Sequence, residues 1–224
     1  MASSNIIKEL VNEEISIKKA LYRLLVIASD IEDEGLSDWI EKELNGYSVN
    51  DKDIPDYRIV RSSNITYSGL NGSFQVKKLP LPFHYIPEEY RESCFNNLII
   101  DSVDSLEQMS IADGEFMRDL TAFAPMVYKE TGIQCFNIQA NYSSNTYTDL
   151  INIIKTRLLK ILLMLEKELG NLDSLDIPRS ELTPEKMTLL HDAINVIIND
   201  NSVKIGDNNS IEESSFKVGD ADGN

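Results

Sequence analysis

The chain has 224 residues, of which 42% are apolar and 26% are charged, and this composition is ordinary for a folded globular protein. Its length suits one large domain, or one domain with an appendage. The net charge of −16 argues against nucleic acid as the main partner, because surfaces that bind phosphates depend on clustered Lys and Arg.

Cysteine content and hydropathy favour a cytoplasmic protein. Cys94 and Cys135 are too few and too isolated for a disulfide framework, so both are predicted to be buried thiols. Residues 1–4 carry no basic segment that leads into an apolar core, so no signal peptide is expected. The longest uninterrupted apolar runs, such as Ile161–Leu165, are far shorter than the roughly 18–20 residues that span a bilayer. We therefore expect no membrane partner.

Three amphipathic helices are predicted at the start of the chain. Apolar residues recur at three- and four-residue spacing in residues 4–15 and again from Ser16 onward. Gly35 is expected to end the second helix, since glycine readily takes the left-handed conformation of a helix C-cap. Ser37 is expected to cap a third helix. The apolar stripes need one another, so residues 4–46 are predicted to form one helical unit.

The pattern then changes to strand. Residues 57–79 are rich in β-favouring residues and contain Asn71-Gly72, a strong tight-turn signal, so they predict a small antiparallel meander. Two prolines at residues 79–82 remove two donors, and the chain is expected to leave the sheet there.

The middle of the chain is predicted to return to helix. Residues 87–106 are predicted as one helix, with Pro87 in its first turn. A short helix is expected over residues 113–124, ended by Pro125. Residues 133–142 alternate loosely and predict one more strand.

The strongest helical pattern covers residues 148–169 and is stopped by Gly170. A helix that is apolar on most faces is either buried centrally or shared between subunits, and we favour the central position. Residues 171–198 are predicted as a linker and a shorter helix that Thr183 caps. The predicted class is therefore α+β, mainly helical, with a small antiparallel sheet and a long central helix in one domain over residues 1–170.

Residues 199–224 are predicted as a short β-repeat tail, because residues 198–207 align with residues 211–220 at an offset of 13. Apolar residues alternate within each copy, as they do in strands. Two copies cannot bury a core alone. The tail is then either disordered or stacks against copies from other subunits. The residues that would self-associate are Val203, Ile205, Ile211, Phe216 and Val218.

Catalytic and metal-binding patterns are weak. His84 and His191 lie outside metal-ligand motifs, and no phosphate-binding glycine motif is present. A nucleophilic pair of Cys94 with His84 remains open, although no spacing signals it. Paired acids, such as Asp101 with Asp104, are common in so acidic a chain and indicate solvated faces. Oxygen ligands in the tail match no full calcium loop. We assign no catalytic residue, no cofactor and no metal.

One polar constellation stands out, at the end of the third predicted helix and the start of the meander. It comprises Trp39, Glu43, Tyr47, Tyr57 and Arg58. The guanidinium could hold a carboxylate or phosphate of a ligand in a bidentate manner. Alternatively, Arg58 pairs with an acid of the helical unit such as Glu43, and the constellation is structural. We favour the structural role.

Trp39-x-x-x-Glu43-Leu44-x-Gly46-Tyr47, followed by Pro55-x-Tyr57-Arg58 and preceded by two amphipathic helices, resembles the N-terminal signature of AbiTii-type proteins. The resemblance covers about residues 5–60 and continues more weakly through residues 148–169. It implies a role in bacterial abortive-infection defence against bacteriophage, and it supplies no catalytic residues.

Three hypotheses follow from this resemblance. The first is a non-enzymatic, cytoplasmic defence component that forms homo-oligomers and binds a phage protein or a co-encoded defence protein. The second is a toxin-like effector enzyme, for instance a metal-dependent nuclease, built from scattered acids and Arg58. The third is a regulatory module that restrains a partner toxin.

Overall fold

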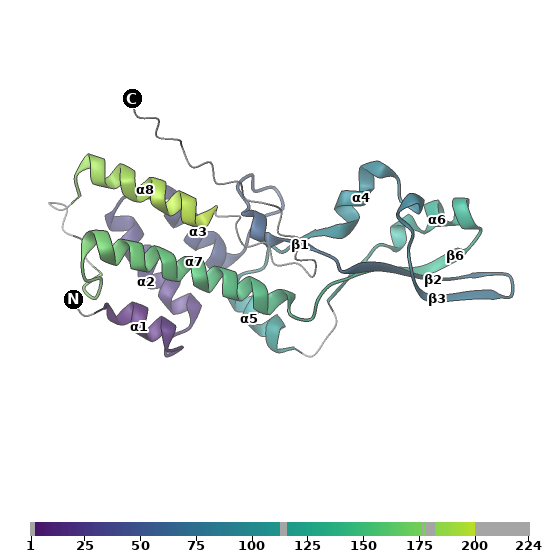
Figure 1. Cartoon of the computed structure of the whole chain (residues 1–224), viewed down its shortest axis with the longest axis horizontal. Coiled ribbons are helices and arrows are strands. Elements are labelled where there is room, and N and C mark those ends of the chain that lie inside the picture. Colours follow the sequence, from purple (N-terminus) through teal and green to yellow (C-terminus); the bar gives the residue numbers. More distant parts are fainter. Residues whose placement is uncertain (1–2, 113–115, 176, 178–181, 200–224) are drawn as a thin grey trace, which may run out of the picture.

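The computed structural model describes residues 3–112, 116–175, 177 and 182–199, and these form an elongated molecule with helices at one end and a sheet at the other (Figure 1). We call the helical end the helical body. Its helices are α1 (Asn5–Val11), α2 (Ile17–Asp30), α3 (Glu34–Asn45), α5 (Val103–Ile111), α7 (Thr146–Leu169) and α8 (Pro184–Ile198). The other end, the sheet lobe, contains β2 (Asn64–Asn71), β3 (Phe74–Pro80), β5 (Met117–Asp119), β6 (Gln134–Asn141), α4 (Glu88–Phe95) and α6 (Ala124–Thr131).

Helix α7 forms the centre of the helical body. Its buried face, which includes Leu150, Ile154, Leu158, Ile161 and Leu165, packs in one core with the apolar stripes of the other helices. Each such side chain contributes about 1.5–3 kcal/mol when it leaves water. Gly170 ends the helix with a φ of 86°. The predicted long central helix is therefore confirmed, and its core includes Leu190 and Ile194 of α8.

The sheet lobe has a second core of its own. Its four strands are antiparallel in the order β3-β2-β6-β5, and α4 and α6 lie on the same side of the sheet (Figure 1). Tyr67, Val76, Ile138 and Val127 are among its buried residues. The hairpin turn predicted at Asn71-Gly72 joins β2 to β3, and Gly72 has a φ of 59°. The predicted class, mainly helical α+β, is confirmed.

The predicted meander over residues 57–79 is only partly correct. A 3-10 turn, η1 (Asp56–Arg58), leads into β1 (Ile59–Arg61), which pairs with β4 (Asn96–Leu98) in a separate two-stranded sheet. Strand β3 also extends to Pro80, which is tolerated because β3 is an edge strand.

The helix predicted over residues 87–106 is wrong as one element. The chain becomes extended at β4, where pairing with β1 overrides the helical pattern, and α5 begins only at Val103. The helix predicted over residues 113–124 is also wrong. Residues 117–119 form strand β5, and Pro125 lies in the first turn of α6, where its missing N–H costs nothing.

The expected boundary between α2 and α3 is displaced. Asp33, not Ser37, caps α3, and its Oδ1 accepts a hydrogen bond from the Leu36 N–H at 2.8 Å. Gly35 therefore lies inside the first turn of α3. Thr183 caps α8 as predicted, since its hydroxyl accepts from the Lys186 N–H. Among the described helices, none is long and apolar enough to cross a membrane.

Candidate functional site

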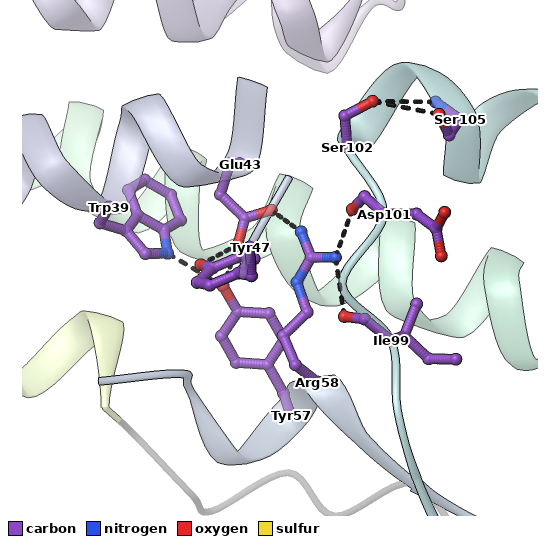
Figure 2. Close-up of polar contacts among 9 residues, drawn as sticks. All are labelled: Trp39, Glu43, Tyr47, Tyr57, Arg58, Ile99, Asp101, Ser102 and Ser105. Carbon is purple, nitrogen blue, oxygen red and sulfur yellow. Dashed lines mark hydrogen bonds and ion pairs between the residues drawn. The ribbon is translucent and has the colours of Figure 1, made fainter. Parts of the chain in front are cut away.

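The five residues that the sequence singled out lie together where the helical body meets the chain that leads to the sheet lobe (Figure 2). We call them the Glu43–Arg58 cluster. Trp39 and Glu43 come from α3, Tyr47 follows it, and Tyr57 and Arg58 come from η1. All five are buried, and Glu43 and Arg58 are 0% exposed.

The Glu43 carboxylate is the acceptor at the centre of the cluster. Its Oε1 accepts hydrogen bonds from the hydroxyls of Tyr47, at 2.8 Å, and Tyr57, at 2.5 Å. Its Oε2 pairs with Nη2 of Arg58. The Trp39 indole donates to the Tyr57 hydroxyl at 2.9 Å. The ion pair between Arg58 and Glu43, one of the two alternatives for this arginine, is present.

Arg58 also holds a third segment of the chain. Its Nη1 donates to the backbone carbonyls of Asp101, at 2.7 Å, and Ile99, at 3.4 Å. The guanidinium carbon lies 4.8 Å from the centre of the Tyr47 ring. The Asp101 carboxylate points away from Arg58 in Figure 2, so its backbone, not its side chain, serves the cluster.

Backbone contacts join the same three segments. The Tyr47 N–H donates to the Ile100 carbonyl at 2.8 Å, and the Ile99 N–H donates to the Arg58 carbonyl at 2.8 Å. Gly46 makes this approach possible. Its φ is 90°, and a Cβ there would lie 2.8 Å from the Ile100 carbonyl oxygen. The glycine before Tyr47 is therefore required by both conformation and space.

Arg157 of α7 is a member that the sequence did not reveal. Its guanidinium carbon lies 4.2 Å from the centre of the Tyr57 ring, a cation–π contact. Its Nη1 donates to the carbonyl of Ile198 at 2.6 Å, at the C-terminal end of α8. Arg157 therefore connects α7 and α8 to the cluster.

The surroundings of Tyr47, Tyr57 and Arg58 keep each of them in one ionisation state near neutral pH. Burial, followed by the adjacent Glu43 charge, raises the pKa of both Tyr47 and Tyr57 above that of a free phenol. Burial alone would lower the pKa of Arg58, but the charge of Glu43, the two neighbouring tyrosines and the hydrogen bond to Glu43 together more than offset this, and the pKa is raised. Both tyrosines remain neutral donors and Arg58 remains a cation.

The hydrogen-bonding groups of the cluster bind one another and the backbone, not a ligand. Both oxygens of the Glu43 carboxylate accept from donors of the cluster, and Nη1 and Nη2 of Arg58 donate within the chain, whereas its Nε is buried and has no hydrogen-bond partner among the described residues. An added anion would have to displace Glu43 from a fully buried arginine. The arrangement is therefore that of a brace between three segments of the chain.

The other side chains considered for chemistry are placed differently. Cys94 is fully buried, and burial raises the pKa of its thiol, the opposite of what activates a nucleophile. The ring of His84 lies edge-on to the ring of Tyr85, and the ring centres are 4.3 Å apart. Asp104 pairs with Lys18 on the surface. Within the part of the chain that the structure describes, no group of three or more His, Cys, Asp or Glu side chains could hold a metal ion.

The five apolar tail residues proposed for self-association lie outside the described residues. These are Val203, Ile205, Ile211, Phe216 and Val218. The predicted β-repeat of residues 199–224 also lies outside them, apart from Asn199, which caps the C-terminus of α8.

Comparison with protein-family models identifies the family of the chain. The family model described as AbiTii matches residues 3–187, which extends well beyond the N-terminal signature and includes α7. No curated protein and no solved structure matches the chain significantly.

Proposed function

The chain belongs to the AbiTii family, and from that membership we propose that it is a bacterial abortive-infection component that protects against bacteriophage. We propose that it acts in the cytoplasm by assembling with copies of itself and binding a phage protein or a co-encoded defence protein, rather than by catalysis. The Glu43–Arg58 cluster, which carries the family signature, supports this proposal because its one carboxylate is engaged inside the fold by Tyr47, Tyr57 and Arg58.

The observation that carries the assembly proposal is the apolar surface of the sheet lobe. Large apolar side chains that are 44–60% exposed occur along β2, β3, β6 and the turn after β3; they are Leu70, Phe74, Leu79, Phe83 and Phe136. Exposed apolar side chains that gather into one patch are typical of an interaction surface.

Charge favours a second copy as the occupant of this surface. Residues 59–99 and 116–145, which include the sheet lobe, carry six basic and five acidic residues, so all of the negative net charge of the chain lies elsewhere. Two sheet lobes can therefore approach each other with little of the repulsion that the helical bodies would impose. Lys77, Lys78 and Pro80 on the edge strand β3 oppose strand pairing there, so contact would be through side chains.

Light scattering on the purified chain tests the proposal. Phe136→Ser should lower the measured mass, whereas Leu189→Ser, on the exposed face of α8, should leave it unchanged and serves as the matched control. Deleting residues 200–224 tests the contribution of the tail and keeps the α8 cap at Asn199. A monomeric parent contradicts self-assembly, and an oligomer whose mass neither change lowers contradicts the sheet lobe and the tail as its contact surfaces.

A plaque assay then connects assembly to defence. Cells that produce the parent chain should show fewer plaques than cells that produce Phe136→Ser, at equal protein levels. Full protection by a folded, monomeric Phe136→Ser protein would show that defence does not need assembly.

A further inference from the structure

A groove of about 750 Å³ lies beside the Glu43–Arg58 cluster, between α3, the loop before η1 and the C-terminal half of α8. Its apolar lining includes Leu36, Trp39, Ile54 and Ile194. A volume of this size is within the range that holds a small molecule or several side chains of a peptide. Trp39 is the only tryptophan of the chain, so the groove contains its own spectroscopic reporter.

The charge of the groove is strongly negative. Seven carboxylate side chains line it, against one lysine and one histidine. That lysine, Lys42, is already paired with Asp38 at 2.7 Å. Carboxylates crowded against apolar walls raise the local concentration of cations. A cluster of acids alone can be a solvated face, so the decisive feature is one buried carboxylate.

Asp33 supplies a buried oxygen without a donor. The residue is 7% exposed, and its Oδ1 is used in capping α3. Its Oδ2 is buried and, among the described residues, has no hydrogen-bond partner. Nε2 of His191, which is also buried and has no hydrogen-bond partner there, lies 3.7 Å from this oxygen, a separation at which a protonated imidazole would form an ion pair with it. This gap is too long for a hydrogen bond.

An N–H donor between these atoms could satisfy both, because a carboxylate only accepts and an unprotonated imidazole nitrogen also accepts. We propose that the groove binds a basic peptide segment of a partner protein, with an ammonium or guanidinium group directed at Asp33. This inference rests on the proposed function, since it gives the chemistry of the partner to which the defence component binds.

Two other occupants fit the groove less well. Residues 200–224 follow directly from the groove-lining Asn199, but they contain six acidic residues and two lysines, so their charge has the same sign as that of the groove. A hard metal ion would need several converging ligands, and none of the described residues form such a group. A lysine or arginine side chain suits acidic groups set among apolar walls, since its stem is apolar and its head is charged.

Titration with a synthetic peptide tests the inference. The probe is a blocked nonapeptide of alternating leucine and lysine, followed through the fluorescence of Trp39, and the comparison peptide has glutamate in place of lysine. The lysine peptide should bind and the glutamate peptide should not. Binding should weaken at 1 M NaCl, where the screening length falls to roughly 3 Å.

The matched variants are Asp33→Asn and Asp119→Asn. Asparagine caps a helix as well as aspartate does, so Asp33→Asn keeps the bond to Leu36 and removes only the charge. Asp119 accepts a similar local bond from the Thr121 N–H but lies in the sheet lobe, far from the groove. Asp33→Asn should weaken peptide binding by about tenfold or more, as expected for a charge-assisted hydrogen bond, and Asp119→Asn should not change it.

Each contrary outcome overturns the inference. Equal affinities for the two aspartate variants would exclude Asp33 as the contact. Binding of spermidine but not of the peptide would identify a small polyamine in place of a protein segment. Much tighter peptide binding after deletion of residues 200–224 would identify the tail as the resident occupant.

Light scattering on Asp33→Asn separates this inference from self-assembly. The variant should keep the mass of the parent, since the groove lies on the helical body and the proposed self-contact lies on the sheet lobe. Loss of peptide binding with unchanged mass supports the groove as the partner site. Failure to bind any peptide by a chain that does assemble overturns the groove alone and leaves the assembly proposal intact.

Discussion

Replacing Glu43 with glutamine should lower the free energy of unfolding by about 3–5 kcal/mol, the usual cost of removing one member of a fully buried ion pair. Glu43 and Arg58 are both 0% exposed, so neither charge can be hydrated by a small rearrangement. Glutamine keeps the volume and one acceptor oxygen for the two tyrosine hydroxyls. Its amide N–H₂ group, however, would face the Arg58 donors, and the cation would remain buried without a counter-charge.

Urea denaturation measures this loss. Circular dichroism reports the helical body, and the fluorescence of Trp39, which hydrogen-bonds to Tyr57, reports the cluster itself. Domains are typically stable by about 5–15 kcal/mol, so the expected loss is a large fraction of the total. Glu13→Gln is the matched control. It makes the same chemical change in a surface pair with Lys155, and no measurable change is expected.

A double-mutant cycle with Arg58→Met sharpens the reasoning. The double variant should be less destabilised than the sum of the single variants, because no unpaired charge then remains. A loss for Glu43→Gln within about 1 kcal/mol of the parent, or additive losses in the cycle, would refute the claim that the pair braces the fold.

Three further predictions concern the same region. Trp39→Ala should cost roughly 3–5 kcal/mol by urea denaturation, and a stable but inactive variant would instead mark this surface as functional. Gly46→Ala should cost of order 1–3 kcal/mol, since its φ of 90° and the nearby Ile100 carbonyl leave no room for a Cβ; thermal melting measures it. Because the pKa of Tyr47 and of Tyr57 is raised in the folded chain, both phenols ionise first in the unfolded chain. The two phenols should therefore leave the free energy of unfolding unchanged below pH ~10 and lower it above that pH, by about 2.7 kcal/mol per pH unit. Denaturation at pH 9 and pH 11 measures the difference.

Individual helices and turns could be predicted where their own residues carry a strong signal. Helix α7 has 24 residues with a continuous apolar stripe and a glycine stop, and the β2–β3 turn has Asn71-Gly72. The pairing of β1 with β4 could not be predicted, because strands of three residues are too short to show periodicity. The boundary of α3 was misplaced for a local reason. Asp33 and Ser37 are both good caps, and the sequence does not rank them.

The Glu43–Arg58 cluster could be predicted only in part, because residue types suggest side-chain pairs but not backbone partners. Glu43 and Arg58 carry opposite charges near Trp39 and Tyr57, so residue types alone suggested that they pair. The backbone carbonyls of Ile99 and Asp101 could not be foreseen, since every residue has a carbonyl and only the fold selects these two. Arg157 could not be foreseen either, because it reaches Tyr57 from a helix a hundred residues later in the chain.

The cluster and the groove are physically continuous, and this relates the family signature to the proposed binding site. Trp39 and Tyr47 face the buried polar network on one side and line the groove on the other. Arg157 holds the end of α8, which forms the opposite wall, against Tyr57. A groove whose walls are fixed in this way loses little conformational entropy when it binds a ligand. Trp39 and Tyr47 therefore form part of the groove wall, while Glu43, Tyr57 and Arg58 contribute to partner binding from behind it, by holding α3 and α8 at a constant separation around Asp33.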